Sequence, residues 1–228
     1  PVQKELALPG DQKKLVAELA NPNITRRMLA MNELSDHYNP KLGPLLKKTV
    51  YGALKKAERK KAQADDDFQV AHALWILHRN SDLDDPTLVA AGEQMSPLVR
   101  VHALRIITDR GIERQINPRL GNLLLPLSLQ NFVRASMTNH DGFVRRAAAE
   151  TVGVWENDEN IRLLLAARQN ADAQDSELIY MIRMSLRNQL KRDGAFADLG
   201  QLSESDSRTI ADVSIAVTNA AAANFLFQ

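Results

Sequence analysis

The chain repeats one short stretch of sequence, since AHALWIL at residues 71–77 returns as VHALRII at residues 101–107. The two copies lie 30 residues apart and share His, Ala and Leu at matching places. The alanine at 73 and 103 is small enough for two helices to approach closely there. A period of roughly 20 to 50 residues is typical of repeat architectures, so the match predicts stacked repeats.

Residues that suit a helix start recur in register with this match. Extending the register places Asp66, Ser96, Asp141 and Asp175 at the N-cap of the second helix of a pair, at steps of 30, 45 and 34 residues. A carboxylate or hydroxyl at an N-cap accepts hydrogen bonds from the free N–H groups of the first helical turn. These four residues therefore predict where four helices begin.

Arginine recurs four residues after some of these starts. Arg100 and Arg145 occupy that place in two units, and Arg26 is the expected counterpart in the first pair. A cation near the start of a helix is unfavourable beside the helix dipole unless it is paired. We therefore expect Arg100 or Arg145 to form an ion pair with an acidic cap of the neighbouring unit.

Helices are expected throughout, because little in the chain favours strands. Only 5% of the residues are aromatic, and no stretch sustains an alternation of apolar and polar residues. Prolines, glycines and capping residues predict helices at 11–20, 24–37, 44–64, a helix through 79 capped from 65–67, one starting at Asp85-Pro86, then 97–111 ended by Gly111, 118–137 interrupted at 126, 141–155, 157–169, 175–191 and one capped by Ser203 or Ser205.

Two helices every 30 to 45 residues fit HEAT or armadillo repeats better than ankyrin or tetratricopeptide repeats, whose signatures the chain lacks. We therefore expect an all-α fold, an α-solenoid (HEAT/armadillo-like superhelix) of five or six helix pairs. It would form a single domain over 1–228, most regular over 11–191 and closed by capping helices in 192–228. The alternative is one helical bundle in which the repeats are coincidental.

The composition is that of an ordinary globular protein and excludes several kinds of site. The formal net charge is +1, which implies no strong overall attraction to nucleic acid or to an acidic membrane. The chain has no cysteine, so disulfides, thiolate zinc sites and C-x-x-C-H haem attachment are excluded. No apolar run reaches the ~18 residues of a membrane span. From the start at Pro1 and the apolar residues before the end, we expect a piece of a longer protein.

Two of the five histidines, His72 and His102, stand at matching places of the repeat. No two histidines are four residues apart on one helix, as a helical zinc pair requires. We therefore expect His72 and His102 to be structural residues at the boundary between repeats, with metal binding as the alternative. Together with Trp75, they are candidates for an interaction surface.

Positive charge is concentrated in residues 47–61, which contain seven lysines and arginines. Lys48, Lys55 and Arg59 lie near one helix face, at i, i+7 and i+11, and such a face can contact phosphates. The segment has one aromatic residue and is followed by three aspartates at 65–67. This pattern favours a solvated outer face over a nucleic-acid site.

No catalytic or cofactor motif is recognisable in the chain. Gly-x-Ser-x-Gly elbows, Walker loops and Gly-x-Gly-x-x-Gly fingerprints are all absent. The aspartates at 65–67 and 82–85 lack the spacing of calcium loops, and helix capping explains them. We therefore expect no catalytic, cofactor-binding or metal-binding residues, and no enzymatic activity of this chain alone.

A family resemblance narrows the expectation. DGFVRR at 141–146 and SPLVR at 96–100 look like the turn-x-x-Val-Arg signature of HEAT repeats. The order LANPNITRR (19–27), AHALW (71–75), VRVHAL (99–104), then ADAQD (171–175) leading into IYMIR (179–183), resembles the HEAT-repeat region of large bacterial membrane-bound dehydrogenases. In that family, such repeats lie between a β-propeller and a c-type haem domain. The resemblance covers about residues 15–190 and implies a periplasmic linking or docking module without the redox or haem site.

The sequence thus predicts a non-catalytic scaffold or protein-interaction module. Its partner would be another protein or another domain of the same polypeptide, because a stacked solenoid exposes a long concave face. The alternative, from a different class, is a HEAT-like DNA-binding or DNA-repair glycosylase domain. The basic segment and the tryptophans Trp75 and Trp155 permit it.

Overall fold

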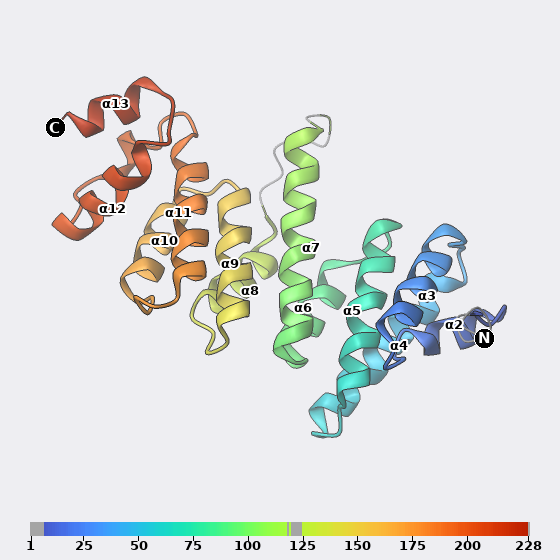
Figure 1. Ribbon diagram of the computed structural model, residues 1–228. Helices are drawn as coiled ribbons and strands as arrows, with labels where there is room; N and C mark the ends of the chain where they lie inside the picture. Colours follow the sequence, from blue (N-terminus) through green and yellow to red (C-terminus); the bar gives the residue numbers. More distant parts are fainter. Residues whose placement is uncertain (1–6, 118, 120–124, 228) are drawn as a thin grey trace. The chain divides into compact units, whose positions relative to one another are not determined.

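The computed structural model describes residues 7–117, 119 and 125–227, and every regular element in these residues is a helix (Figure 1). The all-α prediction is therefore confirmed. The helices are α2 (Gln12–Glu18), α3 (Ile24–Asp36), α4 (Leu42–Glu58), α5 (Ala64–Arg79), α6 (Asp85–Gln94), α7 (Pro97–Ile116), α8 (Leu127–Met137), α9 (Gly142–Val154), α10 (Asn160–Gln169), α11 (Ser176–Leu190), the short 3-10 helix η2 (Ala197–Leu199), α12 (Glu204–Ser214) and α13 (Ala220–Leu226). Within the described part of the chain, none of these helices is long and apolar enough to cross a membrane.

The chain divides into two compact units, unit 1 (Pro1–Ile106) and unit 2 (Ile107–Gln228), and the division falls inside α7. Each unit has its own buried apolar residues. The expected single domain over 1–228, and its five or six repeats, stay predictions.

In unit 1, consecutive helices pack as pairs, α2 on α3 and α4 on α5. Neighbouring pairs pack first helix against first helix and second against second, since α4 also packs on α6 and α3 packs on α5. The start of α7 adjoins α5 through a hydrogen bond between Trp75 and His102. Leucines fill the space between the pairs, and Leu34, Leu46 and Leu74 are fully buried. The unit is therefore two helices thick around one apolar core.

In unit 2, α9 and α11 pack closely together, with α8 against α9, α10 against α11, and α12 against both α11 and α13. The approach of α9 to α11 depends on Gly153, where an added Cβ would lie 2.8 Å from the backbone Cα of Ser185. The hydroxyl of Ser185 donates to the carbonyl of Ala149 across the same contact, at 2.7 Å. A residue without a side chain thus sets the spacing of the two helices.

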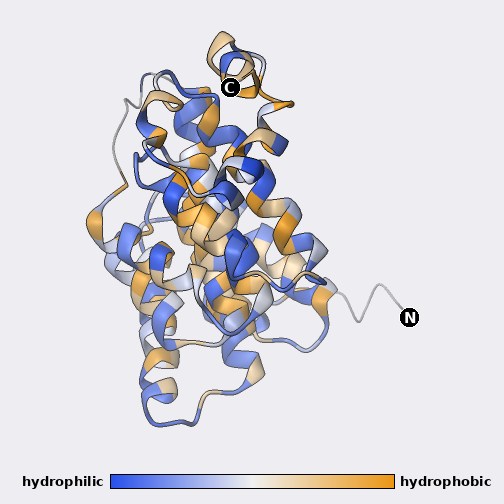
Figure 2. Cartoon of the chain, turned by 90° about the vertical axis from the view of Figure 1, so that its left-hand side faces the viewer, coloured by the Kyte–Doolittle hydropathy of each residue, from blue (hydrophilic) through white to orange (hydrophobic). Residues whose placement is uncertain are grey.

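Amphipathic helices generate both cores, and Figure 2 shows hydrophobic and hydrophilic residues side by side on most helices. On α5, Val70, Ala73, Leu74 and Leu77 recur at i, i+3, i+4 and i+7 and are buried. This is the spacing of one helix face. The pattern explains why α5 is held by its packing against α4.

Several predicted helix starts are confirmed. Asp141 and Asp175 are the N-caps of α9 and α11, where their carboxylates accept backbone N–H groups. Ser203, one of the two candidates, caps α12. Ser96 directly precedes α7, and its carbonyl accepts from the N–H of Arg100, but its hydroxyl accepts no backbone N–H among the described residues and does not cap the helix as predicted. Residues 118 and 120–124 of the expected helix 118–137 lie outside the described residues, and α8 follows Pro126.

The prediction that Asp66 is an N-cap is wrong, because the N-cap of α5 is Gln63. Asp66 lies in the first turn instead, and its Oδ2 accepts from the backbone N–H of Gln63 at 2.9 Å. A carboxylate three residues after the cap can reach back in this way, so an acidic first turn fits either register. The N-cap of α6 is likewise Asp84 rather than Asp85.

The prediction that Gly111 ends its helix is also wrong, because α7 continues through it to Ile116. An added Cβ at Gly111 would lie 2.6 Å from Cγ1 of Val154 and 2.9 Å from Nε1 of Trp155. Glycine is therefore required here for packing within unit 2, and not as a helix stop.

Candidate functional site

An open groove of about 470 Å³ lies on unit 1, between side chains of α3, α5 and the start of α7. We term it the unit-1 groove. It brings together His72, Trp75 and His102, three of the residues predicted for interaction. Its lining consists of Ile24, Arg27, Met28, Met31, Phe68, Ala71, His72, Trp75, Arg79, Leu98, His102 and Arg105.

The groove is lined by a stripe of α3 and a stripe of α5 that are each only partly buried. On α3, Ile24, Arg27, Met28 and Met31 follow i, i+3, i+4 and i+7. On α5, the lining residues at 68, 71, 72, 75 and 79 continue the same spacing. Large apolar side chains stay exposed in this stripe, with 63% of Ile24 and 40% of Met28 accessible to solvent. A stripe that only packs into a core would be buried along its whole length, so the exposed apolar residues indicate a face suited to binding.

Trp75 is held in the groove by histidines. Its indole Nε1–H donates to Nδ1 of His102 at 3.0 Å, and the two rings meet edge to face with their centroids 6.5 Å apart. The ring of His78 also meets the indole edge to face, at 5.7 Å. Because Nδ1 of His102 accepts this hydrogen bond, the imidazole is neutral and carries its hydrogen on Nε2. The aromatic surface of Trp75 is therefore preorganised.

Both groove histidines are kept neutral by their surroundings. Burial, with the charges of Arg27 and His102 nearby, lowers the pKa of His72 to about 4. Burial, followed by the charge of Arg105, lowers the pKa of His102. Nδ1 of His72 lies 3.3 Å from the sulfur of Met31. Within the described residues, no cluster of three or more His, Asp or Glu is placed to hold a metal ion.

Three arginines give the groove a positive charge. Arg27 is buried, its Nη1 donates to the carbonyls of Asn21 (2.7 Å) and Pro22 (3.0 Å), and its guanidinium lies 4.2 Å from the ring centre of Phe68. Arg79 and Arg105 are exposed, and neither has an ion pair or hydrogen bond with another described residue. No carboxylate lines the groove.

The arginines, the methionines and Phe68 of the groove were not identified from the sequence. The spacing of Ile24, Arg27, Met28 and Met31 on one helix is a signal that could have found them. This spacing is hard to recognise because the positively charged Arg27 interrupts the apolar residues. The repeat match found only the part of the groove at His72, Trp75 and His102.

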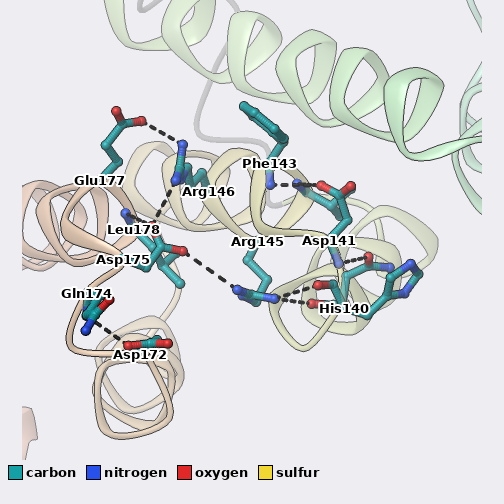
Figure 3. A network of polar contacts seen from close by, with 12 residues as sticks. His140, Asp141, Phe143, Arg145, Arg146, Asp172, Gln174, Asp175, Glu177 and Leu178 are labelled. Carbon is teal, nitrogen blue, oxygen red and sulfur yellow. Dashed lines mark hydrogen bonds and ion pairs between the residues drawn. The ribbon is translucent and has the colours of Figure 1, made fainter.

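In unit 2, Asp175 joins the start of α11 to α9 through two arginines (Figure 3). Its Oδ1 accepts from the N–H of Leu178 at 3.1 Å and from Nη2 of Arg146 at 2.9 Å, while Nη2 of Arg145 lies 3.7 Å from Oδ2. Arg146 also donates to Glu177 at 2.6 Å. The hydrogen bond from Leu178, together with the two arginines, lowers the pKa of Asp175. The predicted ion pair of Arg145 with an acidic helix cap is therefore confirmed, whereas the assignment of the two residues to neighbouring repeats stays a prediction.

Arg100 behaves differently from that prediction. Its Nε donates to the carbonyl of Gly92 at 2.6 Å and its Nη2 donates to the carbonyl of Glu93 at 2.9 Å, both in the last turn of α6. Arg145 makes the same kind of contact, with its Nη1 on the carbonyls of Asn139 and His140. Carbonyls at a helix end lack partners within the helix, so a guanidinium compensates them.

In the first helix pair, the arginine that donates to the preceding carbonyls is Arg27. The N-cap of α3 is Asn23, and Arg27, four residues on, donates to the carbonyls before the helix. The expectation that Arg26 is the counterpart is therefore wrong by one residue. Arg26 instead forms an ion pair with Glu18 of α2 at 2.9 Å. We refer to the contacts of Arg27, Arg100 and Arg145 with carbonyls as arginine ties.

The basic face of α4 is separate from the groove, because Lys48, Lys55 and Arg59 are exposed and none of them lines it. Other lysines of the helix are neutralised within unit 1. Nζ of Lys47 lies 2.9 Å from Oδ1 of Asp82, and Nζ of Lys56 lies 2.6 Å from Oδ1 of Asp66. This arrangement is that of a solvated helix face.

Trp155, which the DNA-binding alternative requires on a binding surface, is buried in unit 2. Its Nε1–H donates to the carbonyl of Ile107 at 2.9 Å, and the guanidinium of Arg114 lies 4.8 Å from the ring centre. Only 8% of the residue is exposed. The indole therefore has no free face on which a base can stack.

No family model matches the chain, and no curated protein matches it either. The resemblance to the HEAT-repeat region of membrane-bound dehydrogenases therefore stays an expectation.

Proposed function

We propose that this chain is a non-catalytic scaffold of HEAT-like repeats that holds a protein partner or another domain of its own polypeptide. The observation that carries the proposal is the partly exposed stripe of α3 and α5, whose apolar side chains line an open groove. Exposed apolar residues that gather in one patch are typical of interaction sites.

The recurrent helix starts support a repeat architecture. Asn23, Asp141 and Asp175 each cap the second helix of a pair, and arginine ties follow at Arg27, Arg100 and Arg145. Chance would not be expected to place the same contact after three helix starts. The proposal therefore includes a solenoid of helix pairs, in which like helices line a common face.

The groove is suited to binding rather than to turnover. A general acid–base pair or an activated nucleophile requires two polar groups that act together on one bond. In the unit-1 groove, His102 is engaged by Trp75 and His72 lies against Met31, and no carboxylate or hydroxyl side chain is part of the lining. The resemblance adds a place for the module, between the redox domains of a periplasmic dehydrogenase.

Site-specific photo-crosslinking in cells that make the full-length polypeptide tests this function. The photo-reactive p-benzoylphenylalanine would replace Met28, which is exposed in the groove, and in a matched control would replace Lys48 on α4. We expect one discrete crosslinked species from position 28, to another protein or within the polypeptide, and none from position 48. Absence of a crosslink specific to position 28, or catalytic turnover by the purified chain, would contradict the proposal.

A further inference from the structure

The unit-1 groove combines cations that have no acidic partner with an apolar lining. The formal net charge of all 228 residues is only +1. Yet three guanidiniums, from Arg27, Arg79 and Arg105, belong to a groove whose lining contains no carboxylate. Arg79 and Arg105 have no ion pair with any described residue, and the Nε–H of buried Arg27 has no acceptor there. Guanidinium groups of this kind match carboxylates in charge and in geometry.

The floor between these charges is apolar. Met31, Phe68 and Trp75 line it, and Ile24, Met28 and Leu98 stand exposed around it. Thioether side chains adapt to the shape of what they contact, whereas Trp75 is fixed by its hydrogen bond to His102. A floor of this composition suits an aliphatic or aromatic side chain and offers nothing to a fully polar one.

We infer that the unit-1 groove binds an acidic protein segment in which an aliphatic or aromatic side chain lies between carboxylates. The apolar side chain enters the floor beside Trp75 and Met31, and the carboxylates pair with Arg79 and Arg105. The inference rests on the proposed function and defines the chemistry of the partner. Charge complementarity, rather than the apolar surface alone, determines this choice of occupant.

A protein segment is favoured over a nucleic acid by the rest of the lining. A nucleic-acid site needs a continuous track of cations along the phosphate backbone, in addition to the side chains that contact or stack on the bases. The groove has no Ser, Thr, Asn or Gln side chain, and the basic residues Lys48, Lys55 and Arg59 lie outside it. Its apolar residues outnumber its cations, as in a site that anchors a side chain.

The test uses a library of random peptides of about 12 residues displayed on phage, selected on the full chain. A parallel selection uses the double variant Arg79→Glu/Arg105→Glu. Both arginines are exposed and unpaired among the described residues, so the variant should keep its fold, which circular dichroism verifies. We expect the wild-type chain to enrich peptides with Asp or Glu next to an aliphatic or aromatic residue. Failure to enrich them, or equal enrichment on the variant, would overturn the inference.

Affinity measurements with one enriched peptide, labelled with a fluorophore, then test the charge pairing. We expect Arg79→Glu/Arg105→Glu to weaken binding at least tenfold, and the matched double variant Lys48→Glu/Lys55→Glu on α4 to leave it within twofold. A peptide with lysine in place of its acidic residues should bind the Arg79→Glu/Arg105→Glu chain better than the wild type. Binding of a labelled oligothymidylate that is lost in the same variant would instead assign the groove to nucleic acid and overturn the inference.

Failure of the inference is distinguishable from failure of the proposed function. The photo-crosslink from position 28 reports any partner in the groove, whatever its charge. In cells, Arg79→Glu/Arg105→Glu should reduce this crosslink at least tenfold, whereas Lys48→Glu/Lys55→Glu should not. If the crosslink persists in the Arg79→Glu/Arg105→Glu variant, the scaffold function still holds, but the proposal of an acidic partner is overturned.

Discussion

His72 shows how the surroundings of a single side chain set the charge of the groove. Its side chain is half-buried, its Nδ1 lies 3.3 Å from the sulfur of Met31, and the charge of Arg27 also acts on it. Burial and this cation both disfavour the imidazolium. The positive charge of the groove near neutral pH therefore comes from its arginines and not from its histidines.

The lowered pKa of His72 predicts a pH dependence of stability. Folding lowers the pKa from 6.5 to about 4, so the unfolded chain takes up the proton first as the pH falls. The stabilisation is therefore fully present above pH 6.5 and is lost as the pH falls from 6.5 to about 4. We expect the thermal midpoint of the wild type to fall over this interval, and that of His72→Gln to fall less. An NMR titration of His72 with an ordinary pKa near 6.5 would contradict this.

At the scale of elements, the contact of α9 with α11 depends on the absence of a side chain at Gly153. An added Cβ would lie 2.4 Å from Oγ and 2.8 Å from Cα of Ser185, so the helices would have to separate. We expect Gly153→Ala to destabilise the protein by about 1 to 3 kcal/mol. Its matched control is Gly52→Ala on the exposed face of α4, where an added Cβ meets nothing within 4 Å.

That control should gain about 0.5 to 1 kcal/mol, because alanine loses less backbone entropy than glycine in a helix. Urea denaturation of the two variants measures both changes. Equal effects of Gly153→Ala and Gly52→Ala would show that α9 and α11 are not in the close contact described.

Arginine ties connect the start of a helix to the loop or helix end that precedes it, and the tie of Arg100 depends on the fork of the guanidinium. Arg100 uses Nε and Nη2 on two carbonyls, whereas the ammonium of lysine is a compact donor that cannot reproduce this geometry. We expect Arg100→Lys to lower the free energy of unfolding by about 1 kcal/mol. The same change at exposed Arg59 should have no measurable effect. If both variants lost the same free energy of unfolding, the contacts of Arg100 with the carbonyls would not be the cause.

Helix starts were predictable where the signal is local. Asp141 and Asp175 cap α9 and α11 because a carboxylate next to a free helix end finds its partners within a few residues. Gly111 was mistaken for a helix stop because its role is set by Trp155, far along the chain. The sequence pattern assigns Asp66 to the N-cap of α5 because a carboxylate can accept N–H groups at a helix start either from the N-cap or from the third position of the first turn.

The groove was predictable only in part, for a related reason. The sequence match aligns His72 with His102, but α5 begins at Ala64 and α7 at Pro97, so His72 lies one helical turn further from its helix start than His102 does. Trp75, and not His72, is consequently the residue hydrogen-bonded to His102. Which side chains meet across two helices depends on how the helices are placed, and repeat spacing alone does not determine that.

At the scale of the whole molecule, the near-neutral charge argues against a nucleic-acid function. Lys47 and Lys56 of the basic segment are paired with aspartates, and Trp155 is buried. We expect no binding of a labelled DNA duplex by the purified chain, even at low salt, where phosphate contacts are strongest. Salt-sensitive binding that is abolished by Lys48→Glu/Lys55→Glu would contradict this and restore the DNA-binding alternative.

The most direct test of the groove as a binding site uses the six methionines of the chain as reporters. Met28 and Met31 line the unit-1 groove, whereas Met137 and Met184 belong to unit 2. The chain would be labelled with ¹³C at the methionine methyl groups and titrated with an acidic, apolar peptide enriched on the wild type. We expect the signals of Met28 and Met31 to shift in a saturable way while those of Met137 and Met184 stay in place. Shifts confined to Met184, or no shift at Met28 and Met31, would contradict the assignment of the groove as the binding site.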